Sequence, residues 1–544
     1  MTHREVLTAM SGLLLAMFVA MLSSTVVTNA LPTIVADLDG SQTGYTWVVV
    51  ATLLTTTVST PLWGKTADLV SKKLLVQLGL SIYVLASLLA SFAPSMSVLI
   101  AARALQGVGA GGILALVQVV IGTIVSPRER GRYSGYLGAV FAVATVSGPL
   151  VGGLVVDSVL GWRGVFWLSL PFAVAALVVL QRTLHLPTAP RREVHVDVLG
   201  SLLLVGGVSL LLIWVSLAGD QFDWVSGTTA LMVGGAVVVL ALAVLVEAKV
   251  ARDPVLPLDL FRDRVIVLAV IASAMVGVAM FGATVYLSQY FQTARGMTPT
   301  EAGLMSICMV GGLLVSSITS GRVITATGLW KRWLVGGMVL VVVGLGLLAT
   351  IDETTSLVVI GLFMAVLGVG LGATMQNLVL VVQNAVPLHR IGVASSVAAF
   401  FRTLGGSIGV SALGALLAHR VTSDIVSGLA ALGIDASDVS GTASTHSLPA
   451  PVLAVVEHAY GDGFSLLFLV AAPLAAVALV AVLLMREVPL RTTVGAGSAS
   501  SPAGARTAEA VPAVPAAPAA PTGSGAGDLR HSATRATEAA TLEV

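Results

Sequence analysis

Apolar runs of about 18 to 25 residues recur along almost the whole chain, and this feature limits the fold more than any other. Each run is long enough to cross a bilayer core of roughly 30 Å as an α-helix. The composition agrees, because 56% of the residues are hydrophobic and 10% are charged, whereas ordinary soluble domains carry about 25% charged residues. We therefore expect an all-α polytopic membrane protein.

The apolar runs predict about fourteen membrane-spanning helices. The first run is too long for a secretory signal, so we expect it to remain as an uncleaved span. The expected spans are residues 9–31, 45–64, 74–93, 97–120, 134–156, 164–182, 197–217, 228–248, 266–290, 301–324, 333–350, 356–384, 393–418 and 464–486.

Lysine and arginine concentrate in alternate loops between these spans. One set of loops holds most of the cations, whereas the other set holds only Arg163, Arg295 and Arg420. Cytoplasmic loops of membrane proteins carry this excess of positive charge. An odd number of spans would scramble the partition, so both termini are expected in the cytoplasm, with the chain in the plasma (bacterial inner) membrane.

Two of the cation-rich loops have weakly similar sequences. The stretch "GKTADLVSKK" begins at Gly64, and "GRVITATGLWKR" begins at Gly321. The spacing predicts two six-helix halves, residues 1–190 and 261–490, separated by two additional helices and a linker within 191–260. Residues 491–544 lack large apolar runs and repeat proline, which predicts a disordered cytoplasmic tail. Residues 421–462 are expected to form a solvated outer cap.

One arginine interrupts an otherwise apolar span in "RALQGVGAGG", residues 103–112. An intramembrane guanidinium costs several kcal/mol, so Arg103 either has a functional role or snorkels to the outer interface. Gly107 and Gly111 follow at i+4 and i+8 on the same helix face, and such a smooth face favours close helix contact. The pattern favours an Arg103 that points into the bundle.

A glycine- and proline-containing stretch, "ATVSGPLVGG", lies in the fifth expected span and contains Gly148, Pro149, Gly152 and Gly153. Proline removes a backbone hydrogen bond and kinks a helix, and glycines open a groove for a partner helix. Kinks of this kind are common in membrane helices, so the stretch alone leaves an ordinary structural role open.

Together, these motifs resemble those of the major facilitator superfamily, in its fourteen-helix drug:proton antiporter family. The resemblance extends over about residues 5–490 and includes stretches at 161–171, 286–304 and 382–410. It implies the major facilitator fold, with two six-helix halves plus two extra helices and a substrate site between the halves. It also implies export rather than import, through the fifth-helix motif, and a role for Arg103 in proton coupling.

The resemblance further implies a gate on the cytoplasmic side, in which an acid pairs with cations of a neighbouring loop. The alternative is that these cations only set the topology. The implied gate residues are Gly64, Asp68, Lys72, Lys73, Arg128, Arg130 and Arg132.

The sequence departs from the family pattern in its first helix, where Ser23 stands at the position of an embedded aspartate. A buried carboxylate attracts cationic drugs and carries protons, so its absence predicts neutral or weakly charged lipophilic substrates. Asp157 and Glu301 are then the candidate proton carriers. The candidate substrate contacts are Ser23, Ser24, Thr28, Asn29, Gln376, Asn377 and Arg402; bonds within or between helices, and snorkelling of Arg402, are the alternatives.

These features predict a secondary transporter that exports lipophilic drugs or antibiotics by proton antiport. A dedicated exporter of one endogenous metabolite or antibiotic is the alternative. A membrane-embedded lipid enzyme is disfavoured, because no His/Asp/Glu set with ligand spacing occurs, and no phosphate-binding loop supports an ATP-driven pump. We expect no cofactor or metal beyond the proton gradient, no nucleic-acid partner at a net charge of +1, and a functional monomer in the lipid bilayer.

Overall fold

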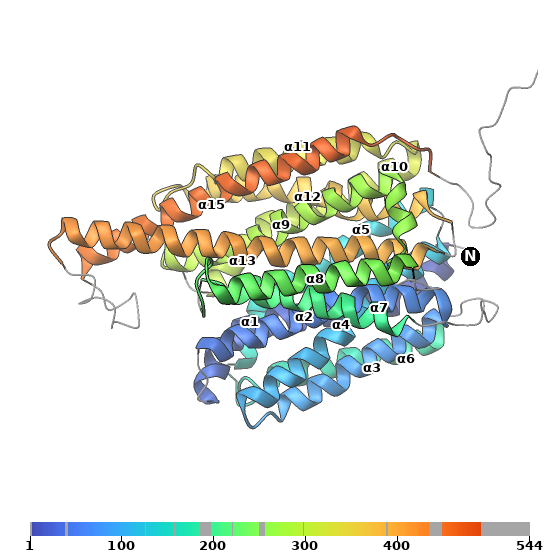
Figure 1. Ribbon diagram of the computed structural model, residues 1–544, viewed down its shortest axis with the longest axis horizontal. Coiled ribbons are helices and arrows are strands. Elements are labelled where there is room, and N and C mark those ends of the chain that lie inside the picture. Colours follow the sequence, from blue (N-terminus) through green and yellow to red (C-terminus); the bar gives the residue numbers. More distant parts are fainter. Residues whose placement is uncertain are drawn as a thin grey trace, which may run out of the picture. The chain divides into compact units, whose positions relative to one another are not determined.

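The computed structural model describes residues 3–38, 42–125, 127–156, 158–184, 197–219, 221–249, 256–297, 299–387, 390–434 and 449–490. These residues fold almost entirely into α-helices joined by short turns, so the predicted all-α fold is confirmed (Figure 1). The predicted disordered tail, residues 491–544, lies outside the described residues. The helices are α1 His3–Asp37, α2 Gln42–Leu69, α3 Lys72–Ser91, α4 Met96–Ile124, α5 Pro127–Val156, α6 Gly164–Thr183, α7 Val198–Leu217, α8 Gly227–Lys249, the 3-10 helix η1 Leu258–Arg262, α9 Arg264–Thr293, α10 Pro299–Thr327, α11 Lys331–Leu348, α12 Leu357–Ala385, α13 Ile391–Ala431 and α15 Ala450–Leu484.

Twelve helices of the described chain are long and apolar enough to cross a membrane. Two further helices contain shorter apolar stretches, Gly135–Thr145 in α5 and Leu199–Val215 in α7. The chain is therefore a multi-pass membrane protein, while the count of fourteen spans stays a prediction. We call the end of the bundle at which α1 begins and α15 ends the inner end, and the opposite end the outer end.

The helices of the first and second halves pack in the same order. In the first half α4 packs against α2 and α3, and α1 packs against α5 and α6. In the second half α12 packs against α10 and α11, and α9 packs against α13 and α15. The additional pair, α7 and α8, packs together and contacts α2 and α13 through α7.

Glycines fix this repeated packing at the level of single residues. A Cβ on Gly107 would lie 2.4 Å from the carbonyl oxygen of Thr52, and a Cβ on Gly368 would lie 1.9 Å from that of Met309. Only glycine lets the backbones of α2 and α4, or of α10 and α12, approach this closely.

The same register continues one turn further along both helix pairs. Gly111 lies against the backbone of Thr56, as Gly372 lies against that of Leu313. Met309 and Leu313 of α10 follow Thr52 and Thr56 of α2 by the same number of residues by which Gly321 follows Gly64. The weak sequence similarity between the two loops therefore reflects the same helix packing in both halves.

Two helices extend past the ends expected from hydropathy. α13 has 41 residues, about 60 Å at 1.5 Å per residue, and α15 begins at Ala450 rather than near residue 464. Much of the expected solvated cap is therefore helical, and Figure 1 shows the two helices extending beyond their neighbours. Val421 and Leu429 are buried in this extension. Apolar residues thus recur on one side of the helix between the acids and glycines, and their burial stabilises the continuation of α13.

Candidate functional site

Arg103 lies inside the first half, where three helices supply its surroundings. The side chain is 4% exposed, and its Nη1 donates to Oε1 of Gln106 at 2.5 Å. Gln106 Nε2 in turn donates to the hydroxyl oxygens of Ser87 at 2.9 Å and Ser23 at 3.4 Å. Gln106 thus links Arg103 on α4 to α1 and α3, and the guanidinium is held within the half rather than at the outer interface.

The local sequence explains why α4 holds its arginine so firmly. Glycines on α4 bring α2 close, and hydroxyl groups of α2 then donate to α4 carbonyl oxygens. Thr52 Oγ1 donates to the carbonyl oxygen of Arg103 at 3.2 Å, and Thr56 Oγ1 donates to that of Gly107 at 3.1 Å. Trp63 Nε1 completes the seam by donating to the carbonyl oxygen of Val108 at 3.0 Å.

The charge of Arg103 is balanced by amide and hydroxyl dipoles rather than by a carboxylate. Among the described residues, no acidic side chain forms an ion pair with Arg103, and its Nε is buried without a hydrogen-bond partner. Ser23, at the position where the family pattern has an acid, bonds to Gln106 and so belongs to this network. A buried cation without a counter-ion raises the local positive potential.

A second polar cluster joins the two halves. Gln118 Nε2 on α4 donates to Gln376 Oε1 on α12 at 2.9 Å. Gln383 Nε2, also on α12, donates to Ser395 Oγ on α13 at 2.7 Å and to the carbonyl oxygen of Gln118 at 3.3 Å. We call Gln118, Gln376, Gln383 and Ser395 the amide clasp. It lies toward the inner end, because α4 and α12 end there and α13 begins there.

Close backbone contacts surround the amide clasp on the same side. A Cβ on Gly64 of α2 would lie 2.0 Å from Oγ of Ser396 on α13. On the opposite side of the bundle, Gly138 of α5 faces Ser317 of α10, where a Cβ would lie 2.8 Å from Oγ. The halves therefore meet through α2 with α13, through α5 with α10, and through the amide clasp.

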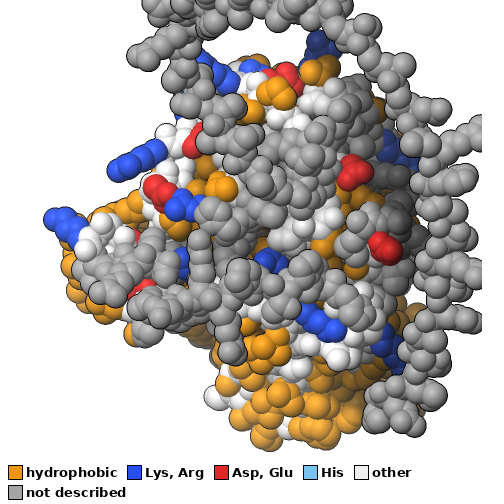
Figure 2. Space-filling view, turned by 90° about the vertical axis from the view of Figure 1, so that its right-hand side faces the viewer, with side chains coloured by type: hydrophobic (Ala, Val, Ile, Leu, Met, Phe, Trp, Pro, Cys, Tyr) orange, Lys and Arg blue, Asp and Glu red, His pale blue; other side chains and the backbone are white. Residues whose placement is uncertain are grey.

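The inner end also carries the positive charge that the loop pattern predicts. Figure 2 looks onto this end and shows lysine and arginine side chains around it. Lys73, one of the expected gate residues, donates its Nζ to the carbonyl oxygen of Gln181 near the end of α6 at 2.8 Å. In the second half, Lys331 Nζ donates to the carbonyl oxygens of Leu483 and Met485 at the end of α15. Both lysines cap a helix within their own half.

Other expected gate residues are only partly described. Lys72 follows the turn into α3 and is half-buried. The side chains of Asp68, Arg128, Arg130 and Arg132 lie outside the described part of the structure. The predicted pairing of the acid with these arginines therefore stays a prediction.

The fifth-helix motif lies at a contact within the first half. A Cβ on Gly148 would lie 2.2 Å from Oγ1 of Thr25 on α1, and one on Gly152 would lie 3.2 Å from Val26. The motif glycines thus let α5 approach α1. The positions of Pro149 and Gly153 on α5 are described, but their side-chain surroundings are not.

The expected substrate and proton residues are dispersed. Asn377 Nδ2 donates to the carbonyl oxygen of Ala373 at 2.8 Å and to Ser320 Oγ at 3.3 Å, so it ties α12 to α10. Arg402 is half-buried and has no hydrogen-bond partner among the described residues. Ser24 and Glu301 are exposed. The side chains of Thr28 and Asn29, and Asp157 as a whole, lie outside the described residues.

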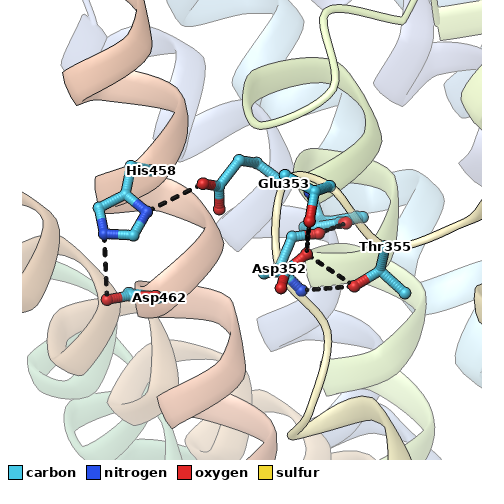
Figure 3. Close-up of polar contacts among 7 residues, drawn as sticks. Asp352, Glu353, Thr355, His458 and Asp462 are labelled. Atoms are coloured by element: carbon cyan, nitrogen blue, oxygen red, sulfur yellow. Dashed lines mark hydrogen bonds and ion pairs between the residues drawn. The ribbon is translucent and has the colours of Figure 1, made fainter.

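Ion pairs and hydrogen bonds tie each half together at the outer end. In the second half His458 Nδ1 lies 2.9 Å from Oε1 of Glu353, and its Nε2 lies 3.8 Å from Asp462 (Figure 3). In the first half Asp37 accepts from Trp162 Nε1 at 2.8 Å and from Arg163 at 3.1 Å. The hydrogen bond from Trp162, followed by that from Arg163, lowers the pKa of Asp37 below its ordinary value of 3.8.

Sequence reasoning missed Gln106, Gln118, Gln383 and Ser395. The available signal was the presence of amide side chains in apolar spans, since such groups need partners within the protein. What the sequence lacks is the identity of each partner.

The structure thus defines a helical membrane protein of two similarly packed halves that are joined by the amide clasp and by the α2–α13 and α5–α10 contacts. Comparison with known proteins also identifies the chain as a membrane transporter. The profile of the Major Facilitator Superfamily matches residues 13–410. The uncharacterized MFS-type transporter Rv1877 of Mycobacterium tuberculosis is 36% identical over 480 residues, which cover 88% of this chain and 69% of the relative. The multidrug transporter protein MdtP of Bacillus subtilis is 33% identical over 412 residues, covering 75% of each chain.

A solved structure with low sequence similarity has the same fold. The proton:xylose symporter XylE, bound to 6-bromo-6-deoxy-D-glucose, matches with a TM-score of 0.58 at 13% identity, covering 87% of this chain and 95% of that chain. The chain therefore belongs to the major facilitator superfamily, a family of membrane transporters, and a protein named as a multidrug transporter is among its relatives.

Proposed function

We propose that this protein is a secondary active transporter that exports lipophilic drugs or antibiotics from the cytoplasm by proton antiport, acting as a monomer in the plasma membrane with both termini inside. The observation that carries the proposal is the amide clasp, in which side chains of both halves bond to one another toward the inner end. The name of MdtP, a multidrug transporter, supports the substrate class.

The amide clasp fits a device that opens and closes. A hydrogen bond between uncharged groups contributes a net of about 0.5–1.5 kcal/mol, because broken bonds are replaced by bonds to water. The few bonds between Gln118, Gln376 and Gln383 can therefore hold the inner end closed and still break in each transport cycle. Gly64 against Ser396 adds a contact with little side-chain volume, which permits the same separation.

Arg103 supplies a fixed positive charge in this mechanism. Because no described acid neutralises it, the charge would polarise water and lower the affinity of nearby groups for protons. Glu301, at the start of α10, and Asp157 are the proposed proton carriers. Uncharged donors such as Gln376 favour neutral or weakly charged lipophilic substrates over permanent cations.

Inside-out membrane vesicles with an imposed pH gradient provide the test. We expect lipophilic drugs to cause proton flux through the native protein and little flux through Arg103→Ala. Absence of any substrate-dependent proton flux in the native protein would refute proton antiport. A panel of drugs in the same vesicles separates a broad exporter from one dedicated to a single compound.

The role of the amide clasp is tested by Gln118→Ala combined with Gln376→Ala. Loss of the Gln118–Gln376 bond should shift the protein toward inner-open states, measured as faster modification of a cysteine placed at Ala394, a fully buried neighbour of the clasp on α13. The matched control is Gln77→Ala, because Gln77 bonds to Gln181 within the first half at 2.7 Å. Equal labelling rates in the clasp variant and the control would argue against a closing role.

A further inference from the structure

An apolar hollow lies in the second half, away from the clasp. It has a volume of about 410 Å³ and is bounded by α9, α13 and α15. Ala274, Val278, Leu404, Ala412 and Leu474 are among its lining residues, and every side chain on its wall is apolar. Volumes of 300–1,000 Å³ are typical of small-molecule sites.

The hollow lies at a depth where only hydrocarbon surrounds the protein. Ala274 and Val278 lie about 15 and 21 Å along α9 from Arg264, at 1.5 Å per residue. Val470 lines the hollow and is 39% exposed. Because it belongs to a membrane-spanning helix, its exposed surface faces lipid. The hollow therefore opens sideways toward the bilayer, and no charged group could be satisfied inside it.

The repeated packing identifies the counterpart of this hollow in the first half. The prolines inside α6 and α15, Pro171 and Pro473, set the correspondence between these two helices. Phe172 then corresponds to Leu474. The buried positions of α1 recur at one constant spacing in α9. The matching buried pairs are Met10 with Val270, Ala16 with Val276, Ala30 with Tyr290 and Leu31 with Phe291.

In this register Phe18 corresponds to Val278, which lines the hollow. Phe18 and Phe172 form an edge-to-face pair in the first half, with ring centroids 6.1 Å apart and an interplanar angle of 78°. The first half thus fills with two aromatic rings the place that Val278 and Leu474 leave open in the second. The helix packing that the two halves share does not require a hollow, because in the first half the same packing occurs with Phe18 and Phe172 in the equivalent place.

We propose that this hollow is a binding site for the uncharged apolar body of a lipophilic molecule that enters from the bilayer. The inference rests on the proposed function, because it identifies the occupant as a transported compound rather than bulk lipid. Two features support that occupant. The opening faces the phase in which lipophilic compounds dissolve, and α13, which forms one wall, also carries Ser395 of the amide clasp.

Photolabelling of the purified full-length protein in lipid nanodiscs tests the proposal. The probe is a neutral aryl diazirine, and the labelled residues are located by mass spectrometry. We expect labels on residues 401–416 and 470–474. Val278→Phe combined with Leu474→Phe rebuilds the aromatic pair in the second half and should reduce this labelling by about tenfold or more, as expected for a blocked apolar pocket.

The matched control reverses the exchange in the first half. Phe18→Val combined with Phe172→Leu should leave labelling of 401–416 unchanged. Ala412→Trp covers the opening from α13 alone and serves as the second filling variant if the double variant does not give a monodisperse protein. Labelling that persists in the filled variants would overturn the proposal. So would a phospholipid carrying the diazirine on its acyl chain that labels the hollow and is not displaced by a neutral drug.

Drug-driven proton flux in vesicles, measured alongside, separates this inference from the proposed function. Labelling that a neutral drug displaces, without any flux, would keep the binding site and reject proton-coupled export. Flux without labelling of the hollow would keep export and reject the site.

Discussion

The two halves share their backbone contacts and differ in the chemistry those contacts carry. Gly107 on α4 and Gly368 on α12 touch equivalent carbonyl groups, yet four residues earlier α4 has Arg103 where α12 has Met364. Both side chains are buried, Arg103 at 4% and Met364 at 0% exposure. Close packing through glycine fixes where the helices cross, and it leaves the neighbouring positions free to be charged or apolar.

The same contrast appears on the side of each half that faces lipid. Phe18 and Phe172 close the first half, and Val278 and Leu474 leave the hollow in the second. The first half therefore holds a fixed charge in a filled bundle, and the second half holds an apolar space. Different side chains on similarly packed helices thus give the two halves different chemistry.

The largest effect is expected from an exchange of the buried residues at these equivalent positions. Met364→Arg places a guanidinium in the second half, where no amide equivalent to Gln106 exists because Leu367 stands there. We expect a loss of about 2.5–3.5 kcal/mol, the cost of arginine at the centre of a membrane helix. Thermal unfolding in detergent measures it.

The reverse exchange, Arg103→Met, should leave the unfolding temperature nearly unchanged and abolish most transport. A buried cation replaced by an apolar side chain of similar volume is often neutral or stabilising. An unfolding temperature lowered as much as in Met364→Arg would contradict the view that Arg103 serves function rather than stability.

The shared glycine contacts should respond alike in both halves. Gly107→Ala and Gly368→Ala each place a Cβ within 2.5 Å of existing atoms, and overpacking of this kind costs about 1–3 kcal/mol. Gly336→Ala is the control, because a Cβ there meets open space. The comparison fails if one glycine tolerates alanine while the other does not.

The lysine caps should have smaller and equal effects. Lys73→Met and Lys331→Met each remove a cation from the end of a helix, which contributes about 0.3–1 kcal/mol. Lys72→Met serves as the control, since the structure gives Lys72 no such bond among the described residues. Free energies of unfolding from denaturant titration test this, and a large loss of transport with no loss of stability would support the predicted gate role of Lys73 instead.

The smallest effect concerns acid at the outer end of the first half. The pKa of Asp37 is lowered from 3.8 in the folded protein, so its bonds to Trp162 and Arg163 stabilise the fold above that value and are lost as pH falls through the lowered pKa. The difference in unfolding temperature between the native protein and Asp37→Asn should therefore shrink on acidification. A difference that grows on acidification would contradict the assignment.

Much of the fold was predictable because it depends on local properties of the chain. The length of an apolar run determines whether a helix can cross a bilayer, and cations in alternate loops indicate its direction. The segment expected to form a solvated cap, residues 421–462, is partly helical, because α13 and α15 continue into it and bury a stripe that includes Val421 and Val456. The inward position of Arg103 was also predictable, since a guanidinium in an apolar span is costly unless it faces the interior of the bundle.

The sequence alone therefore determined the class of protein, its helices and the positions of its unusual residues. The folded structure was needed to show that Gln118 meets Gln376 across 258 residues of chain, that Lys73 caps α6, and that Val278 and Leu474 border a hollow. The physical reason is that hydropathy is a property of one segment, whereas a hydrogen-bond partner or an unfilled volume depends on which segments the folded chain brings together.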